Sequence, residues 1–299
     1  FNGYCYGMER SLEPAMSELI EQAARLILSF FLLTWLSRLT AAWLAAVPVV
    51  ATMLAEIIGL IFVIWRLRIP LHGAAQAAAW REPVLRLAAP ATLSRLVQTL
   101  LRSLTAILIP IRLQASGLPA AEATARLGML NGMVMPLLML PCVFTSALSM
   151  VALPRIAKAE DDPRELKRLI LTCLGSCLPV ALGCTALVYL SAPVLANTVY
   201  RMAELTALFR AGAPLTALFA VSHLIGAVNT ALGQQKRSMY GAVAVSGATL
   251  AMTCLLAAMP GLRLYGVIAA QAVGQVLILL WNVGILALWR KERRSVIHA

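Results

Sequence analysis

Long runs of apolar residues, separated by short polar connections, extend along almost the whole chain. A helix needs about 20 such residues to cross the roughly 30 Å hydrocarbon core of a bilayer. None of the runs alternates apolar and polar residues with a period of two, the pattern of strands in a membrane barrel. The pattern therefore predicts an all-α integral membrane protein, a polytopic bundle of about eight transmembrane helices. We place these helices at about 16–37, 41–65, 89–112, 128–152, 167–190, 206–231, 238–258 and 264–289.

Composition supports lipid as the surrounding solvent. Hydrophobic residues make up 61% of the 299 residues and charged residues only 13%, whereas soluble domains are near half apolar and a quarter charged. Five of the six cysteines lie inside apolar runs, where cysteine usually acts as a small hydrophobic residue. Neither a disulfide framework nor a metal site is indicated.

The distribution of basic residues predicts the orientation of the helices. If residues 1–15 are cytoplasmic and the connections alternate sides, 16 of the 25 Lys and Arg residues lie in cytoplasmic segments, five lie on the opposite side and four lie within spans. Such a bias follows the positive-inside rule, so the C-terminus is expected in the cytoplasm. Because the net charge of +12 is explained by membrane insertion, nucleic acid is not an expected partner.

Two longer cytoplasmic connections have their own patterns. Residues 66–90 are rich in alanine and contain Trp80 and four arginines, which is typical of an amphipathic segment lying on the inner leaflet. The acidic residues 160–162 precede Pro163, and proline is favoured in the first turn of a helix. We interpret this cluster as the start of the next helix.

Several charged residues fall inside the predicted spans, where each costs at least a few kcal/mol and rarely faces lipid. Arg25, Arg95 and Arg102 lie a turn or more inside and too few acids are near to pair with all of them, so we expect them to line a hydrated cavity. Arginine grips phosphate with two parallel hydrogen bonds. The other candidates for this cavity are the acids Glu21 and Glu56 and the polar residues Gln22, Gln98, His223 and Asn229. For Glu18 and Arg210, near span ends, an anchoring role at the headgroups is equally reasonable.

One predicted span holds two prolines, Pro136 and Pro141, in the stretch GMLNGMVMPLLMLP. Proline removes a helix hydrogen bond and kinks the helix, so we expect a bend here that is used in a conformational change. No catalytic motif, phosphate-binding glycine loop or metal-ligand pattern is found in the sequence, and an enzyme is disfavoured. No cofactor is indicated.

The order of several motifs resembles a known family. Ser17, Glu21, Gln22 and Arg25 in MSELIEQAARLI, with Gly3 and Gly7 before them, resemble the loop and fifth helix of stage V sporulation protein B and its relatives. These are polysaccharide-type transporters of the MOP (multidrug/oligosaccharidyl-lipid/polysaccharide) flippase superfamily. Further matches are PATLSRLVQTLL, LPCVFTSALSMVALPRIAKA and GAVNTALGQQKRSMYGAV.

The resemblance implies a fold and a function. The chain would correspond to helices five to twelve of a MATE/MOP-like fold with two lobes, and thus to a protein truncated at its N-terminus. Residues 1–88 would end the first lobe and residues 89–299 would form the complete second lobe. The protein would sit in the bacterial plasma membrane and flip an undecaprenyl-diphosphate-linked saccharide or peptidoglycan precursor by alternating access, in cell-wall or spore cortex synthesis. Arg25, Arg95 and Arg102 would hold the diphosphate, and Glu21 and Glu56 would orient them or bind a coupling ion.

Three alternatives stay open. The first is a multidrug or cation antiporter of the same superfamily, for which Glu56 is the deeply placed acid. The second is a non-transporting membrane scaffold of cell-wall assembly, in which the charges within the spans would pair between helices. The third is a membrane-embedded glycosyl or acyl transferase, against which the missing catalytic motifs count.

Overall fold

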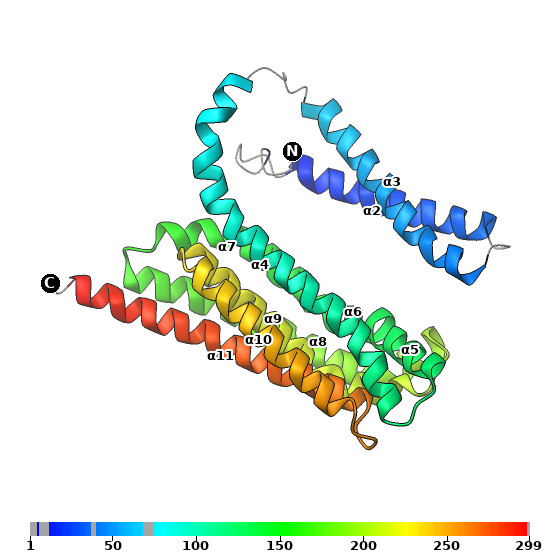
Figure 1. Cartoon of the computed structure of the whole chain (residues 1–299). Coiled ribbons are helices and arrows are strands. Elements are labelled where there is room, and N and C mark those ends of the chain that lie inside the picture. The colour runs from blue at the N-terminus through cyan, green and yellow to red at the C-terminus, as the bar shows by residue number, and fades with distance from the viewer. Residues whose placement is uncertain (1–4, 6–11, 37–39, 68–73, 298–299) are drawn as a thin grey trace. The chain divides into compact units, whose positions relative to one another are not determined.

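A computed structural model describes residues 5, 12–36, 40–67 and 74–297. Its regular structure in those residues is entirely helical (Figure 1). The chain divides into two compact units, residues 1–81 and residues 82–299. Gly3 and Gly7, two of the motif residues, lie outside the described residues.

Unit 1 contains a pair of packed helices, α2 (Leu12–Trp35) and α3 (Ala41–Leu67). The packed face of α3 consists of small side chains: Ala51, Ala55 and Gly59 are buried at intervals of four residues. Small residues let two helices approach closely, which is how membrane helices gain packing energy where lipid offers no hydrophobic drive.

Unit 2 is a bundle whose helices follow the predicted spans closely. Helix α4 (Ala74–Ala115) begins in unit 1 and continues into unit 2. The alanine-rich part of the 66–90 connection is therefore helical and continuous with the span that follows it. The remaining elements are α5 (Ala120–Met129), η1 (Leu130–Val134), α6 (Met135–Leu138), α7 (Leu140–Lys158), α8 (Pro163–Val194), η2 (Leu195–Val199), α9 (Leu205–Ala231), α10 (Gln235–Leu256) and α11 (Leu264–Ile297).

The predicted span 128–152 is interrupted where the two prolines lie. The π-helical turn η1 precedes Pro136, and α6 ends at Leu138 one residue before α7 begins. A π turn moves the hydrogen bonds one residue further back: the amide of Met135 donates to the carbonyl of Leu130. The helix is thus interrupted at the place where the bend was expected, and the physical cause is the pair of amide donors that the two prolines lack.

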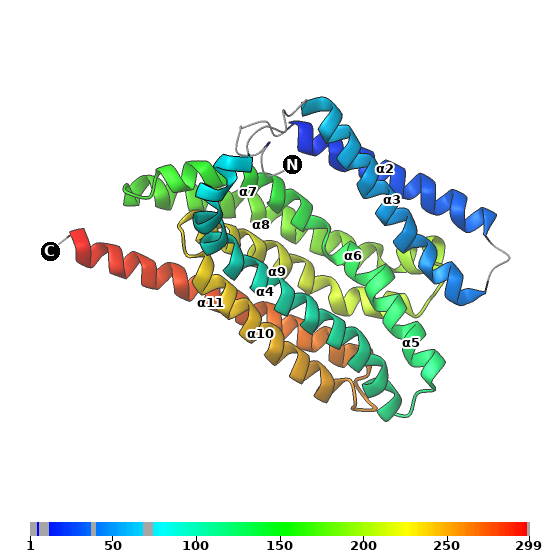
Figure 2. The ribbon, with the colours of Figure 1, turned by 45° about the horizontal axis from the view of Figure 1, so that its top comes forward.

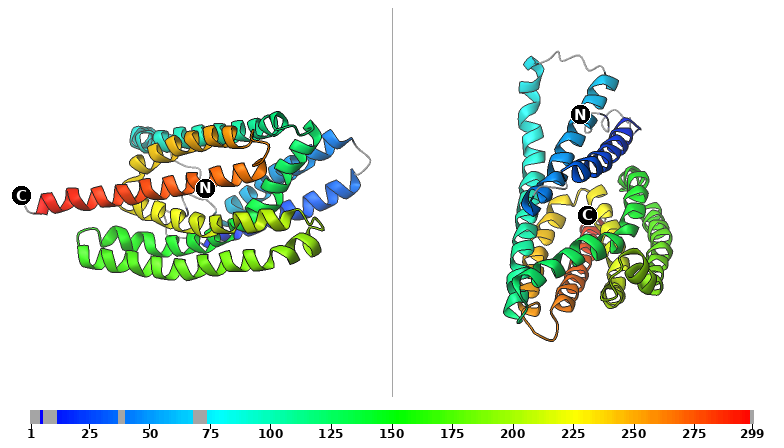
Figure 3. Two further views of the ribbon diagram at one scale, coloured as in Figure 1. Left: turned by 90° about the horizontal axis from the view of Figure 1, so that it is seen from below. Right: turned by 90° about the vertical axis from the view of Figure 1, so that its right-hand side faces the viewer.

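Helix α9 is the centre of unit 2 and packs against α7, α8, α10 and α11. More than half of its residues in the span are buried, as expected for a helix whose apolar residues are spread around its whole circumference. Its first half packs in one apolar cluster, which includes Phe209, Leu130 and Leu138. Its second half packs in another, which includes Leu224, Cys177 and Trp289. Helices α8, α10 and α11 run alongside α9 (Figures 2 and 3).

Two turns of unit 2 depend on glycine. Gly117 and Gly233 have φ angles of 93° and 69°, which L-residues other than glycine rarely adopt. After α9, the amide of Gln234 donates to the carbonyl of Asn229 and the amide of Gly233 to that of Thr230, which is the Schellman pattern of helix termination. The same pattern ends α4 at Gly117.

The acidic cluster at 160–162 starts a helix, as predicted from the sequence. Asp162 caps α8 by accepting hydrogen bonds from the amides of Arg164 (2.8 Å) and Glu165 (3.2 Å), and Pro163 occupies the first turn. The other two acids have a different role, described below.

Seven helices in the described part of the chain are long and apolar enough to cross a membrane, close to the eight expected. The first expected span forms α2 but is not among the seven. Its first half carries Glu18, Glu21 and Arg25, so its uninterrupted apolar run begins only at Leu26. The chain is a multi-pass membrane protein.

Candidate functional site

The candidate residues are distributed over both units. Four belong to unit 1 (Glu21, Gln22, Arg25 and Glu56), and five belong to unit 2 (Arg95, Gln98, Arg102, His223 and Asn229). Each group is described within its own unit.

In unit 1, Glu21 is part of the contact between α2 and α3. Its carboxylate lies against Gly59 so closely that a side chain at Gly59 would collide with it. The hydroxyl of Ser17 lies 3.3 Å from Glu21 Oε1 and 3.3 Å from the Gly59 carbonyl oxygen. Glu21 is therefore held in place by packing, which suits a residue with a positioning role.

Arg25 lies one turn further along α2. One terminal nitrogen of its guanidinium, Nη1, donates to Gln22 Oε1 at 3.2 Å, and its buried Nε has no partner among the described residues. A permanently charged group with an unused donor can accept an anionic ligand. Glu56 is exposed on α3 and shares its face with Val49, Met53 and Leu60.

In unit 2, α4 presents two exposed faces of opposite chemistry. Arg95 and Arg102 are exposed, and exposed Thr99 lies between them on the same face. At 3.6 residues per turn, the exposed apolar residues cluster about 150° around the helix from these arginines. Those residues are Leu93, Leu96, Leu100, Leu104, Ile107 and Ile111.

A third face of α4 is packed, and it fixes the direction of the arginines. Ser94, Ile109 and Leu113 are buried on it, and Gln98 Nε2 donates to Ser94 Oγ at 3.2 Å. Arg95 and Arg102 stand beside this packed face. Seven residues apart, they are about 10 Å apart along the axis, a distance across which two long side chains can converge on one phosphate group.

The other two polar candidates contact neighbouring helices. His223 Nδ1 lies 3.1 Å from Thr145 Oγ1 on α7. Asn229 is fully buried, and its Nδ2 donates to the carbonyl (2.9 Å) and side-chain oxygen (3.2 Å) of Asn282 on α11. The sequence identified both residues as polar but not these partners, since neither Thr145 nor Asn282 stands out in its apolar run.

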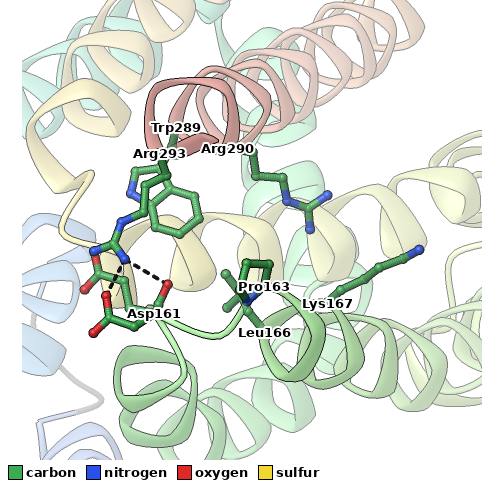
Figure 4. A pocket seen from close by; sticks show the side chains of 8 residues that line it. Asp161, Pro163, Leu166, Lys167, Trp289, Arg290 and Arg293 are labelled. Carbon is green, nitrogen blue, oxygen red and sulfur yellow. Dashed lines mark hydrogen bonds and ion pairs between the residues drawn. The ribbon is translucent and has the colours of Figure 1, made fainter. Parts of the chain in front are cut away.

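An ion-pair cluster at the end of unit 2 was not predicted from the sequence. Arg293 near the end of α11 binds Glu160 Oε1 and Asp161 Oδ1, each at 2.6 Å, and its guanidinium lies over the ring of Trp289 (Figure 4). The adjacent Glu292 pairs with Arg237 at the start of α10. These contacts bring the α7–α8 connection, the start of α10 and the end of α11 together. Because Arg293 and Asp161 are 132 residues apart in the sequence, no local pattern reveals the pair.

Comparison with solved structures defines the class of fold. The chain is similar to the inward-facing conformation of a multidrug resistance MATE family transporter of the MOP superfamily, with a TM-score of 0.73 and 14% identity over 97% of this chain and 68% of that one. It is similar to an outward-facing conformation of such a transporter, with a TM-score of 0.67 and 15% identity over 97% and 66%. A third match is a MATE structure in the bent conformation, with a TM-score of 0.64 and 14% identity over 97% and 65%.

At these identities the likeness is one of fold, and the chain spans about two thirds of the length of these structures. The fold is therefore like that of these MATE transporters, as the resemblance in the sequence led us to expect. A family model described as polysaccharide biosynthesis protein matches residues 1–160, more than half of the chain. The chain belongs to the polysaccharide biosynthesis protein family. No curated protein sequence matches it.

Proposed function

We propose that this chain serves in a flippase that moves a lipid-linked saccharide of the undecaprenyl-diphosphate type across the plasma membrane. Membership of the polysaccharide biosynthesis family and the MOP-type fold support a transporter whose cargo carries sugar. A setting in cell-wall or spore cortex synthesis is part of the same proposal.

The arginine face of α4 is the observation on which the proposal depends. Thr92–Ala115 is long and apolar enough to span a membrane, yet Arg95 and Arg102 lie within it. Both arginines are exposed, and their face lies about 150° around the helix axis from the exposed leucines and isoleucines. An arginine directed toward lipid would instead lie on that apolar face. A charged face within a span marks a water-filled path for an ionic substrate.

In the proposed mechanism, Arg25, Arg95 and Arg102 hold the diphosphate while the polyprenyl tail stays in lipid. Glu21 and Glu56 orient the cationic groups or bind a coupling ion. Polar contacts come from Gln22, Gln98, His223 and Asn229. Residues 1–88 and 89–299 act as parts of two lobes, and alternating access follows from their rocking around the substrate. The bend between Pro136 and Pro141 is a suitable hinge for that motion.

The proposal is tested by measuring translocation of a fluorescent undecaprenyl-diphosphate saccharide in vesicles that contain the protein. We expect Arg95→Gln with Arg102→Gln to reduce the flipping rate at least tenfold, because a charge-assisted bidentate contact contributes about 1.5–3 kcal/mol. Arg112→Gln, an exposed arginine at the end of the same helix, is the matched control and should leave the rate unchanged. Equal rates for the double variant and the unchanged protein would refute the assignment.

The same vesicles distinguish the rival transporter. A drug or cation antiporter would take up a cationic dye against a proton or sodium gradient, would lose that uptake with Glu56→Gln, and would be indifferent to the loss of the two arginines. A scaffold would move neither compound.

A further inference from the structure

A pocket of about 100 Å³ opens at one end of unit 2, between the α7–α8 connection and the last turns of α11 (Figure 4). Leu166 and Trp289 supply apolar lining, and the Arg293 ion pairs form part of the wall. Lys167 and Arg290 supply two further cations. Nothing in the proposed transport mechanism uses this pocket.

The charges of the pocket are arranged unevenly. Arg293 is matched by Glu160 and Asp161 at 2.6 Å each. Lys167 and Arg290, by contrast, form no ion pair with any residue in the described part of the chain. Figure 4 shows both side chains on the far side of Leu166 from the Arg293 contacts. The unpaired positive charge is therefore concentrated on one side.

Each of these two cations continues an exposed apolar stripe of its helix. Lys167 lies four residues before Leu171 of α8, which is 56% exposed, and Arg290 lies seven residues after Val283 of α11, which is 46% exposed. Spacings of four and seven residues keep side chains on one helical face. The cations thus stand where the apolar surface of the bundle ends.

Helix length places that border at the level of the lipid headgroups. The membrane-spanning element Pro163–Val199 has 37 residues, which corresponds to about 55 Å at 1.5 Å per residue. The hydrocarbon core is only about 30 Å thick, so roughly eight residues at each end extend beyond it if the helix is centred. Lys167, the fifth residue of α8, falls in that interfacial part.

We propose that Lys167 and Arg290 bind the phosphate of an anionic phospholipid whose acyl chains lie on the exposed apolar face of α8. Basic pockets between helices at a membrane surface recognise such headgroups. A phospholipid fits better than a soluble anion because the apolar stripe continues directly from the two cations. The charged residues of the lining carry a net charge of +1, three cations against two acids, and both acids are engaged by Arg293.

The test is native mass spectrometry of the whole chain, released from bilayers that contain equal amounts of phosphatidylglycerol and phosphatidylcholine. We expect phosphatidylglycerol to be retained preferentially. Lys167→Ala with Arg290→Ala should lower its relative affinity roughly ten- to thirty-fold, given about 1 kcal/mol per cation near an anionic headgroup. The charge-preserving pair Lys167→Arg with Arg290→Lys should keep most of it.

A charge-matched control uses Lys158→Ala with Lys236→Ala, which removes two exposed cations from helices α7 and α10 and should leave the preference intact. If this control loses as much phosphatidylglycerol as the pocket variant, binding reflects bulk charge and the site is refuted. Undiminished retention of phosphatidylglycerol by Lys167→Ala with Arg290→Ala also refutes the site. Competition by millimolar inorganic phosphate would overturn the lipid assignment in favour of a soluble anion.

Discussion

Single polar residues inside the bundle differ in what they contribute, and burial separates them. Asn229 is fully enclosed and contacts Asn282 of another helix, whereas Arg95 and Arg102 are exposed on a face apart from the leucines. The first arrangement holds two helices together, and the second leaves two positive charges accessible on the surface of α4. The sequence alone shows all three only as polar residues in apolar runs, because burial depends on neighbours from distant segments.

At this scale we expect Asn229→Ala to destabilise unit 2 by about 1 kcal/mol, because it removes the bond to Asn282 and leaves that amide without its partner in an apolar interior. Thermal unfolding in detergent should show a transition lowered by a few degrees. Thr230→Ala is the control, since within the described structure the hydroxyl of Thr230 bonds only to the Gly226 carbonyl of its own helix. Equal effects of the two substitutions would contradict the inter-helix role.

At the scale of helices, the apolar runs predicted nearly every element, because membrane helices must satisfy their backbone bonds internally. The break at Pro136 and Pro141 was also predictable, since its cause is local. The second π turn, η2, was not. Its carboxyl end is held by the stacking of Tyr200 on Phe209 and by a 3.5 Å contact from the Tyr200 hydroxyl to the Met133 carbonyl, both made with residues outside the turn.

Close packing between α10 and α11 provides a prediction at this scale. A Cβ atom on Gly266 would lie 2.6 Å from the backbone oxygen of Leu256, whereas one on Gly284 of the same helix would meet nothing within 4 Å. Gly266→Ala should therefore separate the two helices and destabilise the bundle by roughly 1–3 kcal/mol. Gly284→Ala should be neutral or stabilising by up to about 1 kcal/mol.

Chemical unfolding of the two variants in mixed micelles measures this difference. If Gly266→Ala is as stable as Gly284→Ala, the close approach of the helices does not constrain position 266. The sequence does not distinguish these glycines, because both occupy apolar stretches with similar neighbours.

On the scale of the whole molecule, the positive-inside pattern gains support from how unit 2 is arranged. The basic connections assigned to one side, α7–α8, α9–α10 and the end of α11, lie together through the pairs of Arg293 and Arg237. The sequence predicted that successive connections lie on alternating sides of the membrane. The long-range ion pairs show that these three ends share one side of the bundle. Which side faces the cytoplasm stays a prediction.

We expect a green fluorescent protein fused after Ala299 to fluoresce in bacteria and alkaline phosphatase fused there to be inactive, because the basic segments are retained in the cytoplasm. Alkaline phosphatase inserted at Gly261, in the α10–α11 connection, should be active. The reverse pattern of activities would invert the topology and place the lipid pocket in the outer leaflet.

The division of α9 between two apolar clusters has a thermodynamic consequence. The cluster around Phe209 and the cluster around Leu224 meet near Phe219 and Ala220, so each half of α9 packs against its own set of apolar side chains. We expect fluctuations that open one end to leave most contacts of the other intact, as in independently opening cooperative segments. An opening at one end of the central helix would then not by itself open the other end.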